Sequence, residues 1–138
     1  MTAAQRDFDV NCLGIARVAN AFFPLLARRN AKFLAITSRA GSIPTPAEAS
    51  SDRCAYKCSK AAANMMTRLI ALDPANEHVT VLAMCPGWVN TDMGSDYGRV
   101  HPPLEAPESI ALVLAFLSKV NREHNGKFFN QHGQEIPF

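Results

Sequence analysis

Two mainly apolar runs, residues 33–38 and 79–85, constrain the fold of this chain most. Each run has the length of one strand and does not alternate with polar residues, which favours strands buried on both faces of a parallel sheet. Helical patterns of apolar residues flank these runs at about residues 3–28, 53–72 and 107–119. Alternating helices and strands predict an α/β fold with a parallel sheet and right-handed crossovers.

Local signals sharpen these boundaries. Thr2 and Gln5 have the spacing of a capping box, so we expect the first helix to begin there and to bend near Pro24. Residues 39–52 and 87–106 are rich in glycine, proline, serine and threonine and are expected to be loops. A turn and a third short strand, at residues 127–129, are expected near the carboxyl end.

Composition excludes several classes of protein. The chain has 138 residues, of which 48% are hydrophobic and 19% charged, which is typical of one globular domain and not of disorder. The net charge of +2 and the lack of a basic run argue against binding to nucleic acid. No signal peptide is recognisable, and the most apolar run, residues 21–27, is too short to cross a bilayer. We expect a soluble, cytoplasmic protein that has no membrane or nucleic-acid partner.

Four cysteines, Cys12, Cys54, Cys58 and Cys85, occur without the paired spacing of a zinc site. Cys54 and Cys58 are four residues apart and would share one face of a helix. We predict no metal site, and expect reduced, buried thiols.

Tyr56 and Lys60 carry the clearest chemical signal. Their spacing of four residues near the start of a helix places both side chains on one face. A nearby ammonium group favours the phenolate and lowers the pKa of a tyrosine, which could then exchange a proton with a carbonyl or an alcohol. Ser38 could hydrogen-bond the same oxygen. Taken alone, this spacing is equally compatible with a half-buried phenol beside a solvated amine.

The ends of the two expected strands point to the same place. Ser38 closes the first strand, and Pro86 with Gly87 closes the second. Ligands of open α/β sheets bind beyond the carboxyl ends of the strands, so these residues are candidates for one site.

These motifs together resemble the short-chain dehydrogenase/reductase family, in family order and over essentially the whole chain. The family has an asparagine in the helix before the serine strand, then a serine before a glycine-containing loop, then Tyr-x-x-x-Lys before Ala-Ala. A strand ending in Pro-Gly and followed by valine and threonine comes last. The matching residues are Asn11, Ser38, Gly41, Tyr56, Lys60, Pro86, Gly87, Val89 and Thr91. Residues 125–137 look most like the C-factor and sniffer-type carbonyl reductases.

The resemblance implies a catalytic set in which Tyr56 is the general acid of carbonyl reduction. Lys60 would lower the pKa of Tyr56 and bind the nicotinamide ribose, Ser38 would orient the carbonyl, and Asn11 would hold a water of the proton relay. Tyr56 and Lys60 would thus also be cofactor-binding residues.

The resemblance also implies an NAD(P)(H) cofactor, with NADP(H) slightly favoured, and a small carbonyl or alcohol substrate. Pro86, Gly87 and the Val89 backbone would line the nicotinamide, and Thr91 would reach the phosphates. Trp88 and Met93 would wall the substrate pocket.

The sequence departs from the family in one major respect: it contains no Gly-x-x-x-Gly-x-Gly segment and no Asn-Asn-Ala-Gly. Backbone at such glycines approaches the cofactor pyrophosphate, so we expect the chain alone not to hold the cofactor. Residues 1–138 are therefore interpreted as a single truncated, partial Rossmann-like domain, the catalytic half, with three strands and three main helices. The interval from Ser38 to Tyr56 is also a few residues longer than is common in the family.

Two functions remain open at this point. The first is an NAD(P)H-dependent reductase that obtains its missing half from elsewhere. The second is an inactive fragment that acts, at most, as an interaction partner of a full-length homologue. In the family the first two helices of this chain build a dimer interface, so we expect a homo-oligomer or a pair with a homologous chain.

Overall fold

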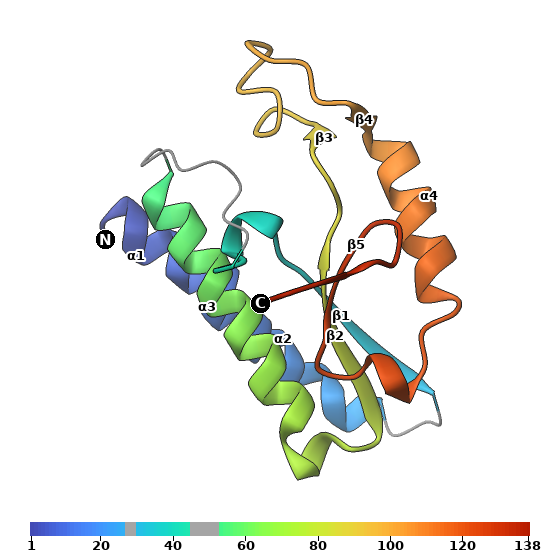
Figure 1. Cartoon of the computed structure of the whole chain (residues 1–138). Coiled ribbons are helices and arrows are strands. Elements are labelled where there is room, and N and C mark those ends of the chain that lie inside the picture. Colours follow the sequence, from blue (N-terminus) through green and yellow to red (C-terminus); the bar gives the residue numbers. More distant parts are fainter. Residues whose placement is uncertain (27–29, 45–52) are drawn as a thin grey trace.

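The computed structural model describes residues 1–26, 30–44 and 53–138. The helices lie in two layers on either side of a sheet (Figure 1). Three of them, α1 (Ala3–Phe8), α2 (Gly14–Phe22) and α3 (Cys54–Leu72), cover one face, and α4 (Ala106–Leu117) covers the other. The expected α/β architecture with helices on both faces is confirmed.

The main sheet has four strands in the order β1-β2-β5-β6, of which the first three run parallel and β6 runs antiparallel to β5. A separate pair, β3 and β4, is also parallel. The three strands expected from the sequence are β1, β2 and β5, and the others are additions. Their bounds are β1 Ala31–Ile36, β2 Val79–Cys85, β3 Val89–Asn90, β4 Leu104–Glu105, β5 Phe128–Asn130 and β6 Glu135–Ile136.

The core is organised around β2, whose seven residues are all buried. Val79 and Val81 pack against α2 and α3 on one face of the sheet. Leu82 and Met84 pack against α4 on the opposite face, together with Phe129 of β5. Burying one such side chain stabilises the fold by about 1.5–3 kcal/mol, so β2 contributes to the cores of both layers.

The expectation that β1 is buried on both faces is wrong. Ala35 is the one fully buried residue of β1, and the side chain of Ile36 is 47% exposed. The cause is the strand order: β1 lies at the edge of the sheet and pairs with β2 alone. Its other edge carries backbone groups that no strand among the described residues pairs.

The first helix begins as expected and is then interrupted. The capping box is confirmed, because Gln5 N donates to Thr2 Oγ1 (3.2 Å) and Thr2 N donates to Gln5 Oε1 (2.7 Å). A π-helical segment, Asp9–Leu13, separates α1 from α2. The helical backbone ends in a 3-10 turn, Phe23–Leu25, around Pro24, and the last predicted residues, 27 and 28, lie outside the described residues.

The loop expected at residues 87–106 is only partly irregular, because β3 and β4 pair across it. Neither strand was expected, since two residues are too short for a recognisable pattern. Of the loop expected at 39–52, residues 45–52 lie outside the described ones. The remaining expected boundaries differ from the observed ones by two residues or fewer.

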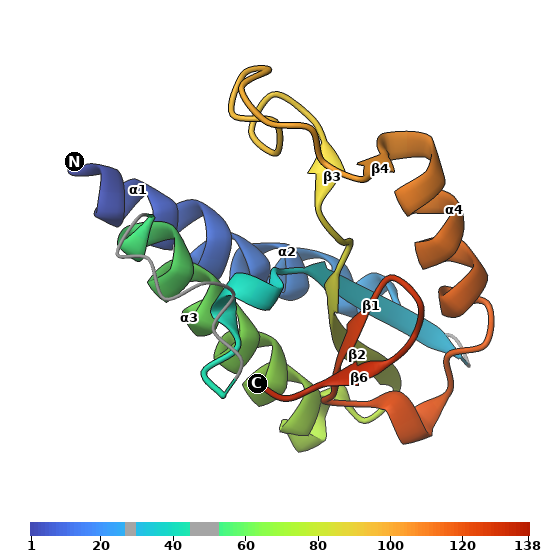
Figure 2. The ribbon, with the colours of Figure 1, turned by 45° about the horizontal axis from the view of Figure 1, so that its top comes forward.

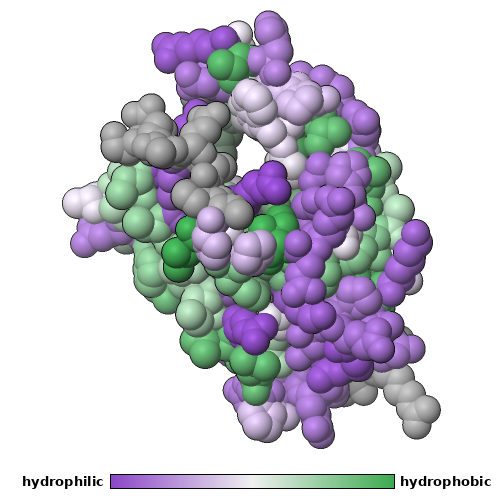
Figure 3. All heavy atoms as spheres, in the orientation of Figure 1, coloured by the Kyte–Doolittle hydropathy of each residue, from purple (hydrophilic) through white to green (hydrophobic). Residues whose placement is uncertain are grey.

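Apolar side chains are exposed on α3, where Met65, Leu69 and Leu72 recur at helical spacing. Figure 3 shows apolar residues gathered on the left of the view, over α3, whereas hydrophilic residues prevail over the carboxyl-terminal segment. Within the described ranges, no helix has the length and apolar character needed to cross a membrane.

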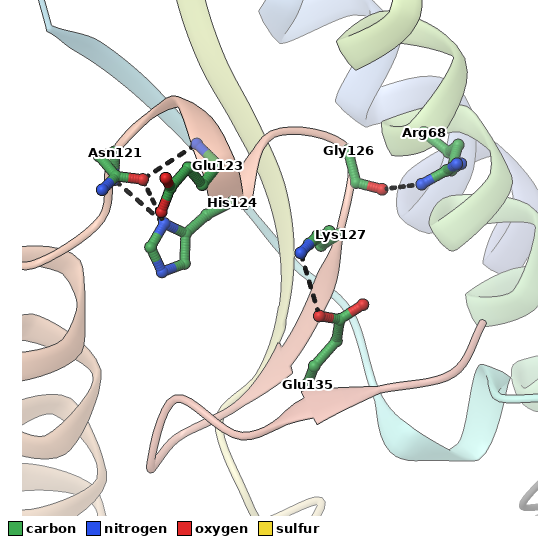
Figure 4. Close-up of polar contacts among 7 residues, drawn as sticks. All are labelled: Arg68, Asn121, Glu123, His124, Gly126, Lys127 and Glu135. Carbon is green, nitrogen blue, oxygen red and sulfur yellow. Dashed lines mark hydrogen bonds and ion pairs between the residues drawn. The ribbon is translucent and has the colours of Figure 1, made fainter.

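Asn125 ties the carboxyl-terminal segment to the centre of the fold. Its Oδ1 accepts from Val81 N (2.9 Å) and its Nδ2 donates to Ala71 O (2.8 Å), so one side chain links β2 to α3. Gly126 N donates to Val81 O (2.8 Å), and Arg68 Nη1 donates to Gly126 O (2.6 Å; Figure 4). These bonds fix the start of β5 beside β2.

The chain on either side of this anchor is held more weakly. The Asn121 side chain accepts from Glu123 N (2.9 Å) and lies 2.8 Å from His124 Nδ1, which caps the short turn before Asn125 (Figure 4). Lys127 and Glu135 form an exposed ion pair (3.3 Å) between β5 and β6. Exposed pairs of this kind contribute little stability.

Replacing Asn125 should destabilise the fold. Asn125→Asp keeps an acceptor for Val81 N but cannot donate to Ala71 O, and Asn125→Ala loses both bonds. We expect the free energy of unfolding, measured by urea denaturation, to fall by about 1–3 kcal/mol for each variant, with the larger loss for alanine. Asn20→Ala, on the exposed side of α2, is the control and should change it by less than about 0.5 kcal/mol. Equal stability of all three variants would contradict the anchoring role.

Candidate active site

Tyr56 and Lys60 lie on one face of α3, as their spacing predicts. The Lys60 Nζ is 5.7 Å from the centroid of the Tyr56 ring, and both residues are half-buried. At this separation a positive charge interacts favourably with the ring. The structure therefore brings together the phenol and the amine of the candidate acid pair.

The Lys60 side chain reaches the carboxyl ends of two neighbouring parallel strands. Its Nζ donates to the carbonyl of Ile36, the last residue of β1 (3.4 Å). Burial lowers the pKa of Lys60 below its usual value of 10.5, and the nearby Cys85, the last residue of β2, acts weakly in the opposite direction. The amine thus occupies the edge of the sheet at which ligands of this architecture bind.

Ser38 lies two residues beyond the end of β1, not at its last position as expected. It precedes a 3-10 turn, Arg39–Gly41, and its Oγ accepts from Ala40 N (3.1 Å). Gly41 packs directly on the backbone of α3, because a Cβ there would lie 2.5 Å from the carbonyl carbon of Lys60. This contact holds the turn that carries Ser38 against the helix that carries Lys60.

Asn11 reaches the same helix from the π-helical segment. Its Nδ2 donates to Ser59 Oγ (2.9 Å), and Ser59 Oγ donates to the carbonyl of Tyr56 (2.7 Å). π-Helical segments often occur at functional sites. The polar chain from Asn11 therefore ends on the backbone of the candidate acid.

Pro86 and Gly87 are anchored by residues that the sequence analysis did not single out. Ser109, in the first turn of α4 and buried, donates to the carbonyl of Pro86 (2.6 Å). Gly87 has a φ of +92°, and a Cβ there would lie 2.7 Å from Leu104 Cδ1 and 3.0 Å from Gln131 Nε2. A serine within a largely apolar helix was the available signal for Ser109.

The four remaining predicted residues follow in the loop around β3. Val89 lies in β3 and pairs with Leu104. Thr91 Oγ1 accepts from Gly94 N (3.0 Å), while Trp88 Nε1 donates to Gly94 O (2.8 Å). The side chains of Trp88 and Met93 are 53% and 66% exposed, so they form an open surface rather than a closed wall.

Two buried polar side chains flank Lys60 and were also missed. Thr37 directly follows β1, and Asn64 lies one turn beyond Lys60 on α3. The Thr37 hydroxyl and both polar atoms of the Asn64 amide are buried without a hydrogen-bond partner among the described residues. Each such group costs about 1–3 kcal/mol. Proteins accept such costs mainly where a site requires polar groups, which supports a functional role for this region.

The cysteines separate into two pairs. Cys12 and Cys85 are buried as expected, whereas the expectation of burial is wrong for Cys54 and Cys58, which lie exposed at the start of α3. Among the described residues, no group of three or more cysteine, histidine or acidic side chains could hold a metal ion.

The residues present fit one end of a nicotinamide cofactor. A phenol and an amine at the ends of β1 and β2 are suitable donors for ribose hydroxyls, beside the fixed turn at Pro86 and Gly87. The sequence has no Gly-x-x-x-Gly-x-Gly segment to approach a pyrophosphate. The nicotinamide end therefore has matching residues in this chain, and the pyrophosphate end does not.

Comparison with known proteins gives consistent results. The family model described as short chain dehydrogenase matches residues 1–100. The protein C-signal of Myxococcus xanthus is 37% identical over 134 residues, which are 96% of this chain and 77% of that protein. The 1-hydroxy-2-glutathionyl-2-methyl-3-butene dehydrogenase of a Rhodococcus strain is 32% identical over 94% of this chain and 56% of its own length.

Solved structures of carbonyl reductases resemble the fold closely. The NADPH-bound carbonyl reductase from chicken fatty liver has a TM-score of 0.88 and 28% identity, and this chain covers 59% of it. The carbonyl reductase Sniffer of Drosophila melanogaster has a TM-score of 0.80 and 27% identity, and 55% of it is covered. The chain thus spans a little over half the length of these structures. With the motifs, the partial Rossmann-like fold and these matches in agreement, the chain belongs to the short-chain dehydrogenase family.

Proposed function

We propose that residues 1–138 form the catalytic half of an NAD(P)H-dependent carbonyl reductase. The observation that carries this proposal is the position of the Lys60 amine. It lies beside the Tyr56 ring and hydrogen-bonds the last carbonyl of β1, at the carboxyl edge of the sheet. Only in this position can one lysine act on both a general acid and a ligand bound beyond the strands. Carbonyl reductases among the structural neighbours support the reaction class.

In the proposed reaction, Tyr56 donates its phenolic proton to the carbonyl oxygen of a small substrate. The Ser38 hydroxyl donates a hydrogen bond to the same oxygen and holds it in line. The Lys60 ammonium stabilises the phenolate that remains, which lowers the barrier to proton transfer. The reduced nicotinamide, when bound, supplies the hydride. Asn11 connects the Tyr56 backbone to the polar interior through Ser59 and would position a water that returns the proton.

The cofactor assignment follows the family and the positions of the remaining residues. Pro86, Gly87 and Val89 would line the nicotinamide, and Thr91 would approach the phosphates once its hydroxyl leaves the Gly94 amide. NADP(H) is slightly favoured, since the chicken carbonyl reductase has NADPH bound. Trp88 and Met93 would contact the substrate from the β3 loop. A cytoplasmic location remains part of this proposal.

The free edge of β1 favours a second candidate function, binding to a related chain. Its unpaired backbone groups and the exposed apolar side chains of α3 are surfaces that a partner could cover. In this case the chain is an inactive fragment that associates with a second copy or with a full-length homologue through α1, α2 and α3. Co-purification of a homologous chain, with no turnover by the complex, would favour this function over the first.

Cofactor binding separates the two contributions that make up a complete site. Titration of the isolated chain with NADPH and NADH, followed by nucleotide fluorescence, should show no binding at micromolar concentrations. A chimaera should bind NADPH and reduce aromatic aldehydes, if the part of the chicken carbonyl reductase outside the matched region is joined to this chain. Micromolar binding by the isolated chain would show that the pyrophosphate end is dispensable.

Tyr56→Phe should reduce kcat of the active chimaera by a factor of about 10²–10⁴, the usual contribution of a general acid. The matched control is Tyr97→Phe, because Tyr97 is the only other tyrosine and is 85% exposed. Its kcat should stay within about twofold. Full turnover in the Tyr56 variant would remove the proposed acid and with it the reductase assignment.

Lys60 should impose a pH dependence on stability. Its pKa is lowered in the folded chain, so over the interval between the folded pKa and 10.5 the unfolded chain binds more protons than the folded one. The free energy of unfolding contributed by this group therefore rises as pH increases through that interval. Lys60→Met should abolish this rise and increase stability at neutral pH. Parallel urea titrations at several pH values would reveal an unchanged slope if burial of the amine has no cost.

A further inference from the structure

Cys54 and Cys58 form a pair of accessible thiols at the start of α3. Cys54 is the first residue of the helix and Cys58 lies one turn further along. Both are exposed, whereas Cys12 and Cys85 are 2% and 8% exposed. Any reagent that needs two thiols at the surface of the folded chain therefore meets this pair and no other.

The two sulfur atoms interact directly. A hydrogen bond with Cys54 is the main cause that raises the pKa of the Cys58 thiol, followed by the charge of Cys54 and then by burial. The pair therefore behaves as one unit, in which a thiolate at Cys54 is stabilised by the remaining proton at Cys58.

Helix geometry decides what this pair can bind. Residues four apart on a helix have Cβ atoms about 5–6 Å apart, while a disulfide needs about 3.5–4.5 Å. A direct disulfide would therefore require the first turn of α3 to unwind. A single atom that bonds both sulfurs fits the helix as it stands, because it adds a second bond length between them. Thiolate pairs are suited to soft, thiophilic centres.

We propose that Cys54 and Cys58 form a dithiol site for a trivalent arsenical, bridged on the surface of α3. With an arsine oxide, two sulfur–arsenic bonds form and the arsenic–oxygen double bond breaks. The oxygen leaves as water with the two thiol protons. Arsenic remains trivalent, so no oxidant or reductant is required.

The bridge would act on the turn of α3 that carries Tyr56. This turn lacks a side-chain cap, and Arg53 before it has a left-handed backbone with a φ of +62°. A covalent link between the first residue and the next turn would staple this unprotected end. Tyr56 is two residues from each cysteine and so points away from the bridge, because successive residues are turned by about 100°.

The test uses the purified, reduced chain and phenylarsine oxide as the probe. Intact mass spectrometry should show one phenylarsine oxide minus one water per chain. The adduct should survive millimolar glutathione and be removed by 2,3-dimercaptopropanol, because attachment at two points raises affinity by about 10²–10⁴ over one point. Protease digestion without reduction should place the arsenic on the peptide that contains both Cys54 and Cys58.

Single substitutions provide the matched controls. Cys54→Ser and Cys58→Ser should each lower the apparent affinity at least about 100-fold, while circular dichroism and the midpoint of thermal unfolding stay unchanged, since both side chains are exposed. An arsenic adduct mapped to Cys12 or Cys85, or retained at full affinity by either serine variant, would overturn the proposal. Loss of the wild-type adduct in glutathione would do the same. None of these outcomes depends on reductase activity.

Discussion

Everything in this fold depends on the complete burial of β2. Both edges of β2 are paired, with β1 and β5, and both of its faces are packed, against α3 and against α4 (Figure 2). A strand in this position cannot shift its register without exposing one full set of apolar side chains. Its carboxyl end is consequently fixed, and so are Cys85 beside Lys60 and the Pro86-Gly87 turn that follows. The candidate site inherits its precision from the core rather than from its own loops.

Features set by short-range sequence were predictable, whereas those set by distant neighbours were not. The Thr2–Gln5 capping box and the Tyr56–Lys60 face depend on a single turn of helix, so residue spacing determines them. The exposure of β1 depends on which strands lie beside it, and the β3–β4 pair joins segments that no local pattern relates. Burial of Cys54 and Cys58 was expected from the usual behaviour of thiols, but the start of α3 lies at the surface.

The candidate site shows the same division. Tyr56, Lys60, Ser38 and Asn11 were found because each lies in a recognisable motif, and the structure places the first two together. Ser109 was missed because its partner, the Pro86 carbonyl, is 23 residues away along the chain. Thr37 and Asn64 were missed because an ordinary polar residue acquires meaning only once it is buried without a partner. The chain thus has polar groups arranged for chemistry on a nicotinamide, but not the glycine-rich backbone that holds a dinucleotide.

The π-helical segment Asp9–Leu13 has a consequence for how the amino-terminal helices can vary. One additional residue in a turn advances the helix by about 100°, so α2 is set in a rotational phase that α1 alone would not give. That phase directs Ala19, and Phe23 beyond it, to the sheet, while Asn11 still faces Ser59. Loss of a single residue from this segment would turn α2 by about a quarter of a revolution, and core packing and the Asn11 contact could no longer be satisfied together.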